Sequence, residues 1–265
     1  MLIRFQLFLL LLAAWPGICS QAQVPAGRAA DSSARVTHPL SRGRAVLLRV
    51  GIPSVLVGVG VLAHSPRYSE MLCRAKEEMQ HETQEVFGGF DAHGLDDYTR
   101  HVPLAVAYGM MATGHRGERT AVGFTLIYLV AHELDAAVVS SLKRLTAEPR
   151  PYDANDLSSF PSAHTAQAFL TATLLHEQYG RQYPWLSVGG YAVASATGAM
   201  RLLGNKHWAT DVLAGAGIGF LSAETVWHLY PVLARLVPGH TARKLLLVPT
   251  YAPGGGAGVA MALSL

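Results

Sequence analysis

The sequence predicts an all-α protein of five to six packed helices, followed by a short C-terminal β-hairpin. Apolar stretches rich in Ala, Gly and Leu recur along the 265-residue chain, and charged segments separate them. Strand signals before residue 244 are weak, and no repeat of 20–50 residues is visible. The apolar stretches have the length and composition of helices that pack on one another, whereas the tail alternates as a hairpin does.

Composition excludes several classes of protein. Half of the residues are hydrophobic and only 15% are charged, which is the opposite of the balance in disordered chains. The two cysteines, Cys19 and Cys73, are too few to crosslink a chain of this length. A formal net charge of +3, without a block of Lys or Arg, argues against a nucleic-acid partner. An apolar globular protein or a membrane protein remains.

The N-terminus has the pattern of a secretory signal peptide over residues 1–22. Arg4 supplies the positive charge, Phe5 to Trp15 form a short apolar core, and Pro16-Gly17 ends it before small residues suited to cleavage. The apolar core is shorter than the roughly 20 residues that span a bilayer, and an uncleaved anchor is the alternative. Residues 23–43 mix Ala, Ser, Pro and Gly without a period and are interpreted as a linker. We therefore expect an exported protein of a bacterial-type cell envelope.

Residues 44–240 form the predicted helical domain. The segment 67–87 carries charge on most turns and is expected to be a solvated helix. The tail, residues 241–265, is expected to be the hairpin, because Leu245–Tyr251 and Val259–Leu265 flank a Pro-Gly-Gly-Gly turn. Apolar helices are expected near residues 50–63, 102–114, 120–131, 165–175, 185–200 and 212–223.

The apolar helices differ in how well they suit a lipid bilayer. The stretch that begins at Thr120 is interrupted by His132, Glu133 and Asp135, which are costly in hydrocarbon. The last apolar stretch reaches Glu224 within a few turns. We expect a packed helical protein that lies on or partly in a membrane, with a fully membrane-spanning protein as the alternative.

Three clusters in the second half of the chain carry side chains suited to an anionic ligand. Cations outnumber the carboxylate in these clusters, and the planar fork of Arg suits phosphate oxygens, while Lys adds a compact charge. Ser162 stands where a helix N-cap is expected, and the N–H groups that follow a cap suit an anion. The clusters are Lys143 with Arg150-Pro151, then Pro161-Ser162-Ala163-His164, then Arg201 with His207 and Asp211.

The two histidines differ in their surroundings along the sequence. His207 and Asp211 are four residues apart, so on a helix they share a face. The carboxylate can hold one imidazole nitrogen and leave the other as a nucleophile that attacks phosphorus. His164 has no acidic partner within its own turn and can give a proton to the leaving oxygen. This mechanism requires no metal and no cofactor.

Together the clusters resemble the signature of the type 2 phosphatidic acid phosphatase (PAP2) superfamily, written KxxxxxxRP, PSGH and SRxxxxxHxxxD. The similarity covers roughly residues 100–230 and implies a helical core that hydrolyses phosphate esters. The family also includes class A acid phosphatases and vanadium haloperoxidases. The resemblance implies phosphate binding by Lys143, Arg150, Arg201, Ser162 and the backbone of Ala163, with His164 as the acid, His207 as the nucleophile and Asp211 as its support.

Two positions depart from the signature. Ala163 replaces its glycine, which leaves the backbone N–H usable only if the local φ is negative. Met200 replaces the serine before the third cationic residue and removes a hydroxyl. Neither change touches a group that transfers a proton, so we expect an altered rate or pocket shape and retained activity.

Other patterns lead to weaker hypotheses. Ser140 and Lys143 match SxxK without its companion motifs, and His132-Glu133 lacks the second histidine of a zinc helix, because Ala136 stands there. The glycines between 215 and 219 favour close helix packing over a dinucleotide site. His93, Asp96, Asp97 and His101 could serve as metal ligands, but a polar turn in which Asp96 or Asp97 caps the next helix is the preferred interpretation.

We therefore expect an exported phosphatase that removes a terminal phosphate through a phosphohistidine, with its active site on the periplasmic side. The substrate is a phosphorylated lipid or a small phosphoester; the low charge favours a lipid near a bilayer. A soluble acid phosphatase, a vanadium-dependent haloperoxidase and a non-enzymatic envelope protein are the alternatives. The oligomeric state is left open.

Overall fold

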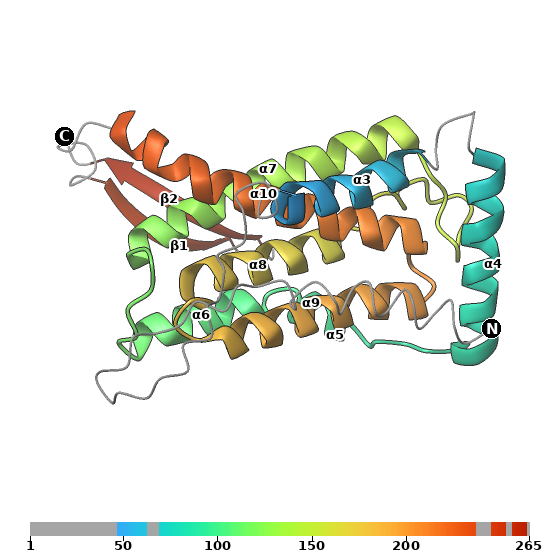
Figure 1. Cartoon of the computed structure of the whole chain (residues 1–265), viewed down its shortest axis with the longest axis horizontal. Coiled ribbons are helices and arrows are strands. Elements are labelled where there is room, and N and C mark those ends of the chain that lie inside the picture. Colours follow the sequence, from blue (N-terminus) through green and yellow to red (C-terminus); the bar gives the residue numbers. More distant parts are fainter. Residues whose placement is uncertain (1–46, 63–68, 237–244, 253–255, 264–265) are drawn as a thin grey trace, which may run out of the picture. The chain divides into compact units, whose positions relative to one another are not determined.

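The computed structural model describes residues 47–62, 69–236, 245–252 and 256–263. Within these ranges the regular secondary structure is helical apart from one hairpin (Figure 1), so the all-α prediction is confirmed. Eight α-helices, α3 to α10, lie in these ranges. Six of them are the predicted apolar helices, and the other two are α4 and the short α5. The predicted signal segment and linker lie outside the described residues. The elements are a π-helical turn Leu47–Gly51, α3 Ile52–Leu62, α4 Ser69–Phe87, α5 Leu95–Thr99, α6 Val102–Ala112, α7 Ala121–Thr146, α8 Ala163–Tyr179, α9 Pro184–Leu203, α10 Ala209–Leu236, β1 Leu245–Ala252 and β2 Gly256–Leu263.

Helix α8 lies at the centre of the bundle (Figure 1). Most of its 17 residues are buried, on every side of the helix and not on one stripe. Phe169 of α8 packs in one cluster with Tyr191 of α9 and Phe220 of α10. Ala166 joins a second cluster that includes residues of α3, α7 and α10. Side chains from four other helices therefore hold α8, and its first turn is set at one end of the bundle.

Glycines in α10 allow its backbone to approach α8 closely. A Cβ atom at Gly219 would lie 1.9 Å from the carbonyl oxygen of Ala166, and one at Gly215 would lie 2.5 Å from that of Ser162. Such distances are far below van der Waals contact, so any larger residue would push the helices apart. The prediction that these glycines serve helix packing is confirmed.

The helix ends follow signals that are present in the sequence. Thr120 caps α7 by accepting a hydrogen bond from the N–H of Gly123 at 3.2 Å, and Pro184 occupies the first turn of α9. Helix α7 stops at Thr146, after which Ala147 takes a left-handed conformation with φ 45°. This turn starts the loop that leads from α7 to α8.

Helix α4 is mostly exposed, as predicted, but one side of it contacts the end of α9. Gln80 is buried and donates to Asn205 Oδ1 at 2.6 Å and to the carbonyl of Leu202 at 3.3 Å. Gln84 donates to the carbonyl of Leu203 at 3.1 Å. These amides supply donors to carbonyls at a helix C-terminus that have no partner within the helix.

Two helices of the described residues, α7 and the Ala209–Val232 part of α10, are long and apolar enough to cross a membrane by length and composition alone. The most apolar window of α10 is 72% buried within the protein, as in a core helix, whereas that of α7 is 33% buried. Helix α7 exposes Val122, Val130 and Leu145. Of the two, α7 is the better candidate for contact with lipid.

The C-terminal hairpin is present as predicted. Strands β1 and β2 pair antiparallel, from Leu245 opposite Leu263 to Ala252 opposite Gly256. The second strand begins at Gly256, three residues before the predicted start at Val259. By its internal contacts the chain divides within α10 into two units, one ending at Trp227 and the other beginning at His228 and containing the hairpin.

Candidate active site

The first two cations are held by the loop between α7 and α8. Lys143, in the last turn of α7, donates through Nζ to the carbonyl oxygens of Ser158 and Ser159, the latter at 3.3 Å. Arg150 donates to Ser158 Oγ at 3.1 Å, and its Nε lies 2.9 Å from Asp156 Oδ2. The same short segment therefore orients both positive side chains.

Ser162 and Ala163 form the first turn of α8. Ser162 is fully buried and is the N-cap, as predicted; its Oγ accepts from the Thr165 hydroxyl at 2.9 Å. The Ser162 hydroxyl therefore still has its own hydrogen to donate. Ala163 begins the helix and is not among the residues with positive φ, so the condition on its backbone N–H is met. The first N–H groups of a helix have no acceptor within it and favour an anion.

His207 and Asp211 face each other at the other side of this turn. His207 precedes α10 by two residues, so the two are not on one helix as the spacing alone suggested, but Nδ1 still lies 3.4 Å from Asp211 Oδ2. The same carboxylate oxygen accepts from Ser159 Oγ at 2.5 Å and from the N–H of Trp208 at 3.0 Å. Asp211 is fully buried, and its contact with Nδ1 leaves Nε2 as the second nitrogen of His207.

The electrostatic surroundings favour an uncharged His207. Burial lowers the pKa of its ring to about 4; Asp211 opposes this effect, and the positive charges of Arg201 and Lys143 add to it. A neutral imidazole retains a lone pair on one nitrogen. Lys143 and Arg201 act on His207, and the N–H of Ser162 donates to the carbonyl of Asp211 at 3.1 Å, so residues from all three sequence clusters meet in one place.

His164 and Arg201 contact two consecutive carboxylates of α5. His164 Nε2 lies 2.7 Å from Asp97 Oδ1, and Arg201 pairs through one terminal nitrogen with Asp96 Oδ2 at 2.5 Å. The prediction that one of these aspartates caps the next helix is wrong, because the N-cap of α6 is His101. The first turn of α5 therefore supplies acidic partners to two residues of the candidate site.

Arg201 also has a hydrogen-bond donor that is not satisfied. Among the described residues, its Nε is buried and has no acceptor. Buried N–H groups in proteins nearly always have a partner, and one attached to a guanidinium is especially costly to leave alone. An anion bound between Arg201 and the first turn of α8 would supply the missing acceptor.

Several residues of this site were not found from the sequence. Ser158 and Ser159 precede the second cluster, with only Phe160 between them and Pro161, and this proximity is the available signal. The sequence around Asp96 and Asp97 indicates only metal ligands or a helix cap. Their partners are 105 and 67 residues further along the chain, so no local pattern identifies the contacts.

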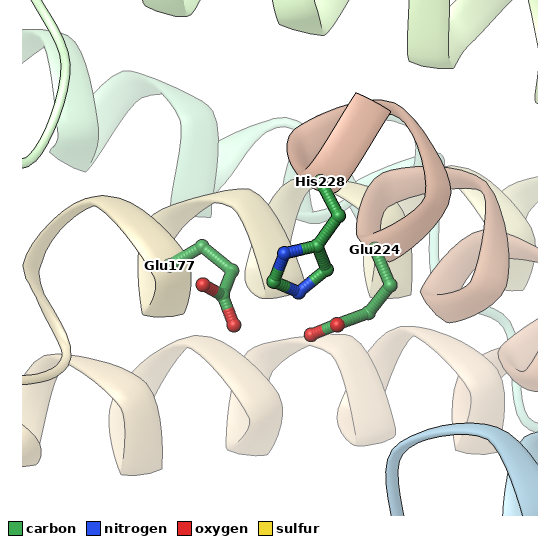
Figure 2. Close-up of side chains that lie close together, drawn as sticks. All are labelled: Glu177, Glu224 and His228. Atoms are coloured by element: carbon green, nitrogen blue, oxygen red, sulfur yellow. The ribbon is translucent and has the colours of Figure 1, made fainter. Parts of the chain in front are cut away.

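A second cluster of titratable groups lies elsewhere on α8. Figure 2 shows Glu177 of α8 and Glu224 of α10 pointing toward one another, and it also draws His228 on α10. Arg49 lies 3.5 Å from one carboxylate and 3.6 Å from the other. Glu177 is about 20 Å along α8 from the first turn, so this cluster is separate from the candidate active site. Arg49 supplies a positive charge to both carboxylates, Glu177 and Glu224.

The helical bundle and the candidate anion site with its two histidines agree with the comparison against known families. The family model of the PAP2 superfamily matches residues 124–235, which contain all three motifs. This match confirms the family that the three motifs predict for these residues.

Among curated proteins, the lipid A 1-phosphatase of Porphyromonas gingivalis is 37% identical over 147 residues, which are 55% of this chain. The match covers 33% of that relative, so the chain spans about one third of its length. No solved structure matches the chain significantly.

Proposed function

We propose that this protein is a metal-independent phosphatase that removes a terminal phosphate from a lipid through a phosphohistidine on His207. The observation that carries the proposal is the buried His207–Asp211 contact, at 3.4 Å, beside the cations Lys143 and Arg201. A neutral, shielded imidazole next to fixed positive charges suits attack on a phosphate group.

The cations and the first turn of α8 bind the phosphate in this proposal. Lys143, Arg150 and Arg201 contact its oxygens, and the buried Nε of Arg201 gains the acceptor that it lacks. The Ser162 hydroxyl and the Ala163 N–H complete the set of donors. These groups stabilise the charge on the equatorial oxygens while the phosphoryl group is transferred.

The reaction has two steps. His207 Nε2 attacks phosphorus, the bond from phosphorus to the leaving oxygen breaks, and His164 gives that oxygen a proton. Water then attacks the phosphohistidine, His164 takes the proton from the water, and the bond between phosphorus and Nε2 breaks to release inorganic phosphate. Asp211 stabilises the positive charge that the His207 ring carries in the intermediate.

A lipid is the proposed substrate class for two reasons. Helix α7 exposes Val122, Val130 and Leu145 and is long enough to reach into a bilayer. The curated relative is named for the 1-phosphate of lipid A. Phosphorylated lipid A is accordingly the first candidate, and phosphatidic acid, phosphatidylglycerophosphate and polyprenyl pyrophosphate are the others.

The proposed location is the bacterial cell envelope. A signal segment at residues 1–22 would deliver the chain across the inner membrane and place the site on the periplasmic side. Attachment is peripheral or integral, and carbonate washing of membranes distinguishes the two: a peripheral protein is released and an integral one is retained.

The first experiment tests the chemistry with purified full-length protein. A generic aryl phosphate should be hydrolysed at an unchanged rate in EDTA, and vanadate should inhibit, because its trigonal bipyramidal form mimics the transition state. Loss of activity in EDTA would contradict the metal-independent mechanism. Bromide oxidation that depends on vanadate would instead indicate a haloperoxidase.

The second experiment tests the substrate. The four phosphorylated lipids and soluble sugar and nucleoside phosphates are compared at equal concentration, with and without detergent micelles. We expect kcat/KM to be highest for a lipid presented in micelles. A higher value for soluble esters would make the protein an acid phosphatase for phosphomonoesters.

A further inference from the structure

We propose that Asp97 is a positioning residue of the same reaction: it binds Nε2 of His164 and leaves Nδ1 as the nitrogen that gives its proton to the leaving oxygen. This inference rests on the proposed function, because it assigns a partner to the proposed acid. Asp97 lies outside the three motifs and outside residues 124–235, which match the family model.

The contact has the geometry of a charge-assisted hydrogen bond. Nε2 of His164 lies 2.7 Å from Asp97 Oδ1, and the His164 side chain is 20% exposed. A bond of this length restricts ring rotation about χ2. A histidine in which a carboxylate holds one nitrogen presents the other in a defined direction and tautomer, as in catalytic triads.

The backbone around Asp97 is fixed to the bundle on two sides. Thr99 Oγ1 lies 2.8 Å from Thr197 Oγ1 of α9, and Thr171 of α8 donates to the carbonyl of Arg100 at 2.9 Å. Asp96, the preceding residue, pairs with Arg201. These contacts hold α5 against α8 and α9, so the Asp97 carboxylate has a constant place relative to His164.

Four charged groups act on His164, and Asp97 is the one that most favours its proton. The pKa of His164 lies below its usual value because burial lowers it most and Arg201 and Arg100 add to this effect, whereas Asp97 and, less strongly, Asp96 raise it. The hydrogen bond to His164 in turn lowers the pKa of Asp97, so this carboxylate stays ionised. Without Asp97, two cations and burial would remain against the imidazolium that the acid step requires.

The proton balance is the same with Asp97 in place. His164 starts as an imidazolium with one proton on each nitrogen. Its Nδ1 proton goes to the leaving oxygen as the bond from phosphorus breaks, and Nε2 keeps its proton and its bond to Asp97. In the second step Nδ1 takes a proton from the attacking water, which restores the imidazolium. Asp97 exchanges no proton in either step.

A different role would follow if the two carboxylates of α5 blocked phosphate binding. Asp96 and Asp97 would then compete with phosphate for the positively charged side chains of the site and would have to move away before phosphate binds. Removing either carboxylate would in that case tighten phosphate binding and raise kcat/KM. The positioning role predicts the opposite sign, so one variant separates the two.

The main test is the pH profile of Asp97→Asn on p-nitrophenyl phosphate and on an alkyl phosphate. We expect kcat for the alkyl ester at pH 7 to fall by roughly tenfold to 100-fold, with little change in KM. The alkaline limb of kcat should move to lower pH by about one unit, because a weaker hold on the proton lets His164 deprotonate sooner. Asp97→Glu should recover part of both. Asp91→Asn removes an exposed carboxylate from the loop before α5 and serves as the matched control.

A double-mutant cycle tests whether Asp97 acts through His164. His164→Ala and Asp97→Asn should each lose less activity on p-nitrophenyl phosphate, whose leaving group needs no acid, than on the alkyl ester. In the His164→Ala background, the additional effect of Asp97→Asn on the alkyl ester should be less than about twofold. Inhibition by vanadate should persist in both variants and so report an intact pocket.

The outcomes are distinct. An Asp97→Asn profile that matches Asp91→Asn, fully additive losses, or tighter phosphate binding with higher kcat/KM would each overturn the positioning role. Failure of the wild-type protein and of Asp91→Asn to hydrolyse any phosphate ester would overturn the proposed function itself. Loss of vanadate inhibition in Asp97→Asn would also contradict the proposal, because it would mean that Asp97 shapes the pocket.

Discussion

The two histidines of the candidate site each face an aspartate, but the pairs are built in different ways. His207 and Asp211 are four residues apart, and their side chains are 2% and 0% exposed. His164 and Asp97 are 67 residues apart, and their side chains are 20% and 57% exposed. One pair is local in sequence and sealed from water, and the other joins distant segments near the surface.

This difference matches the two proposed tasks. A nucleophile has to be neutral and shielded, and burial lowers the pKa of His207 to about 4. An acid has to recover its proton after each turnover, which partial exposure permits. The ring nitrogen that faces the carboxylate also differs: Asp211 faces Nδ1 of His207, whereas Asp97 faces Nε2 of His164. The comparison teaches that two His–Asp pairs in one candidate site can differ both in burial and in the ring nitrogen that the carboxylate faces.

Replacing His207, the proposed nucleophile, should lower kcat more than any other change in either His–Asp pair. His207→Ala is expected to lower kcat by at least roughly 10^4-fold, because no other group in the site replaces its nitrogen. Release of nitrophenol from an aryl phosphate measures the loss. His81→Ala, on the exposed side of α4, is the control and should keep full activity. Turnover of His207→Ala above about one per cent of wild type would remove His207 from its role.

Asp211→Asn should be more harmful than Asp97→Asn. An amide oxygen at position 211 can still accept from Ser159 and Trp208 but cannot stabilise a cationic ring. We expect kcat to fall by roughly 10^2- to 10^3-fold at pH 7, with Asp153→Asn as a surface control. Equal losses of kcat in Asp211→Asn and Asp97→Asn would show that the buried His207–Asp211 pair contributes no more to the reaction than the exposed pair.

The low pKa of His207 predicts how stability depends on pH. The unfolded chain binds this proton near pH 6.5 and the folded chain near pH 4, so unfolding is favoured as pH falls between these values. The contribution is at most about 3 kcal/mol. Denaturant unfolding at pH 7 and pH 4.5 should show a smaller pH effect in His207→Gln than in wild type. An identical pH effect in both proteins would mean that His207 is already protonated when folded.

Ala163→Gly touches neither pair and should have the smallest effect. The backbone N–H at position 163 is retained, so kcat/KM is expected to stay within about threefold of wild type. The unfolding free energy should fall by up to about 1 kcal/mol, because glycine loses more backbone entropy on folding. Kinetics and thermal unfolding measure the two effects. An increase in kcat/KM above about tenfold would show that the alanine methyl group obstructs phosphate binding.

The local parts of the site were predictable from the sequence, and the distant contacts were not. The N-cap at Ser162 and the proximity of His207 to Asp211 depend on neighbours within five residues, although His207 precedes α10 and does not share a helix with Asp211. The local partner of Asp97 is Arg100, 3.5 Å away, and its meeting with His164 depends on how α5 packs against α8 and α9. Periodicity predicts which segments are helical, but it does not predict which loops meet.

The same limit applies to the fold. Apolar stretches predicted six of the helices near their observed places, because a buried helix needs a long apolar segment. The five-residue helix α5 was missed, since a helix of this length has little intrinsic stability and depends on tertiary contacts. Helix α4 was predicted as solvated, yet Gln80 is buried against α9. Long amides that pair with carbonyls at a helix end are not visible as an apolar pattern.

The close contact between α8 and α10 has a consequence for motion at the site. The N–H of Ser162 donates to the carbonyl of Asp211 at 3.1 Å, and Gly215 and Gly219 keep the two backbones at near contact behind that bond. Ser162, the proposed phosphate ligand, and Asp211, which faces the proposed nucleophile, thus belong to one closely packed unit. Thermal fluctuations should displace both together, so the distance from the bound phosphorus to Nε2 of His207 varies less than the position of either helix in the bundle.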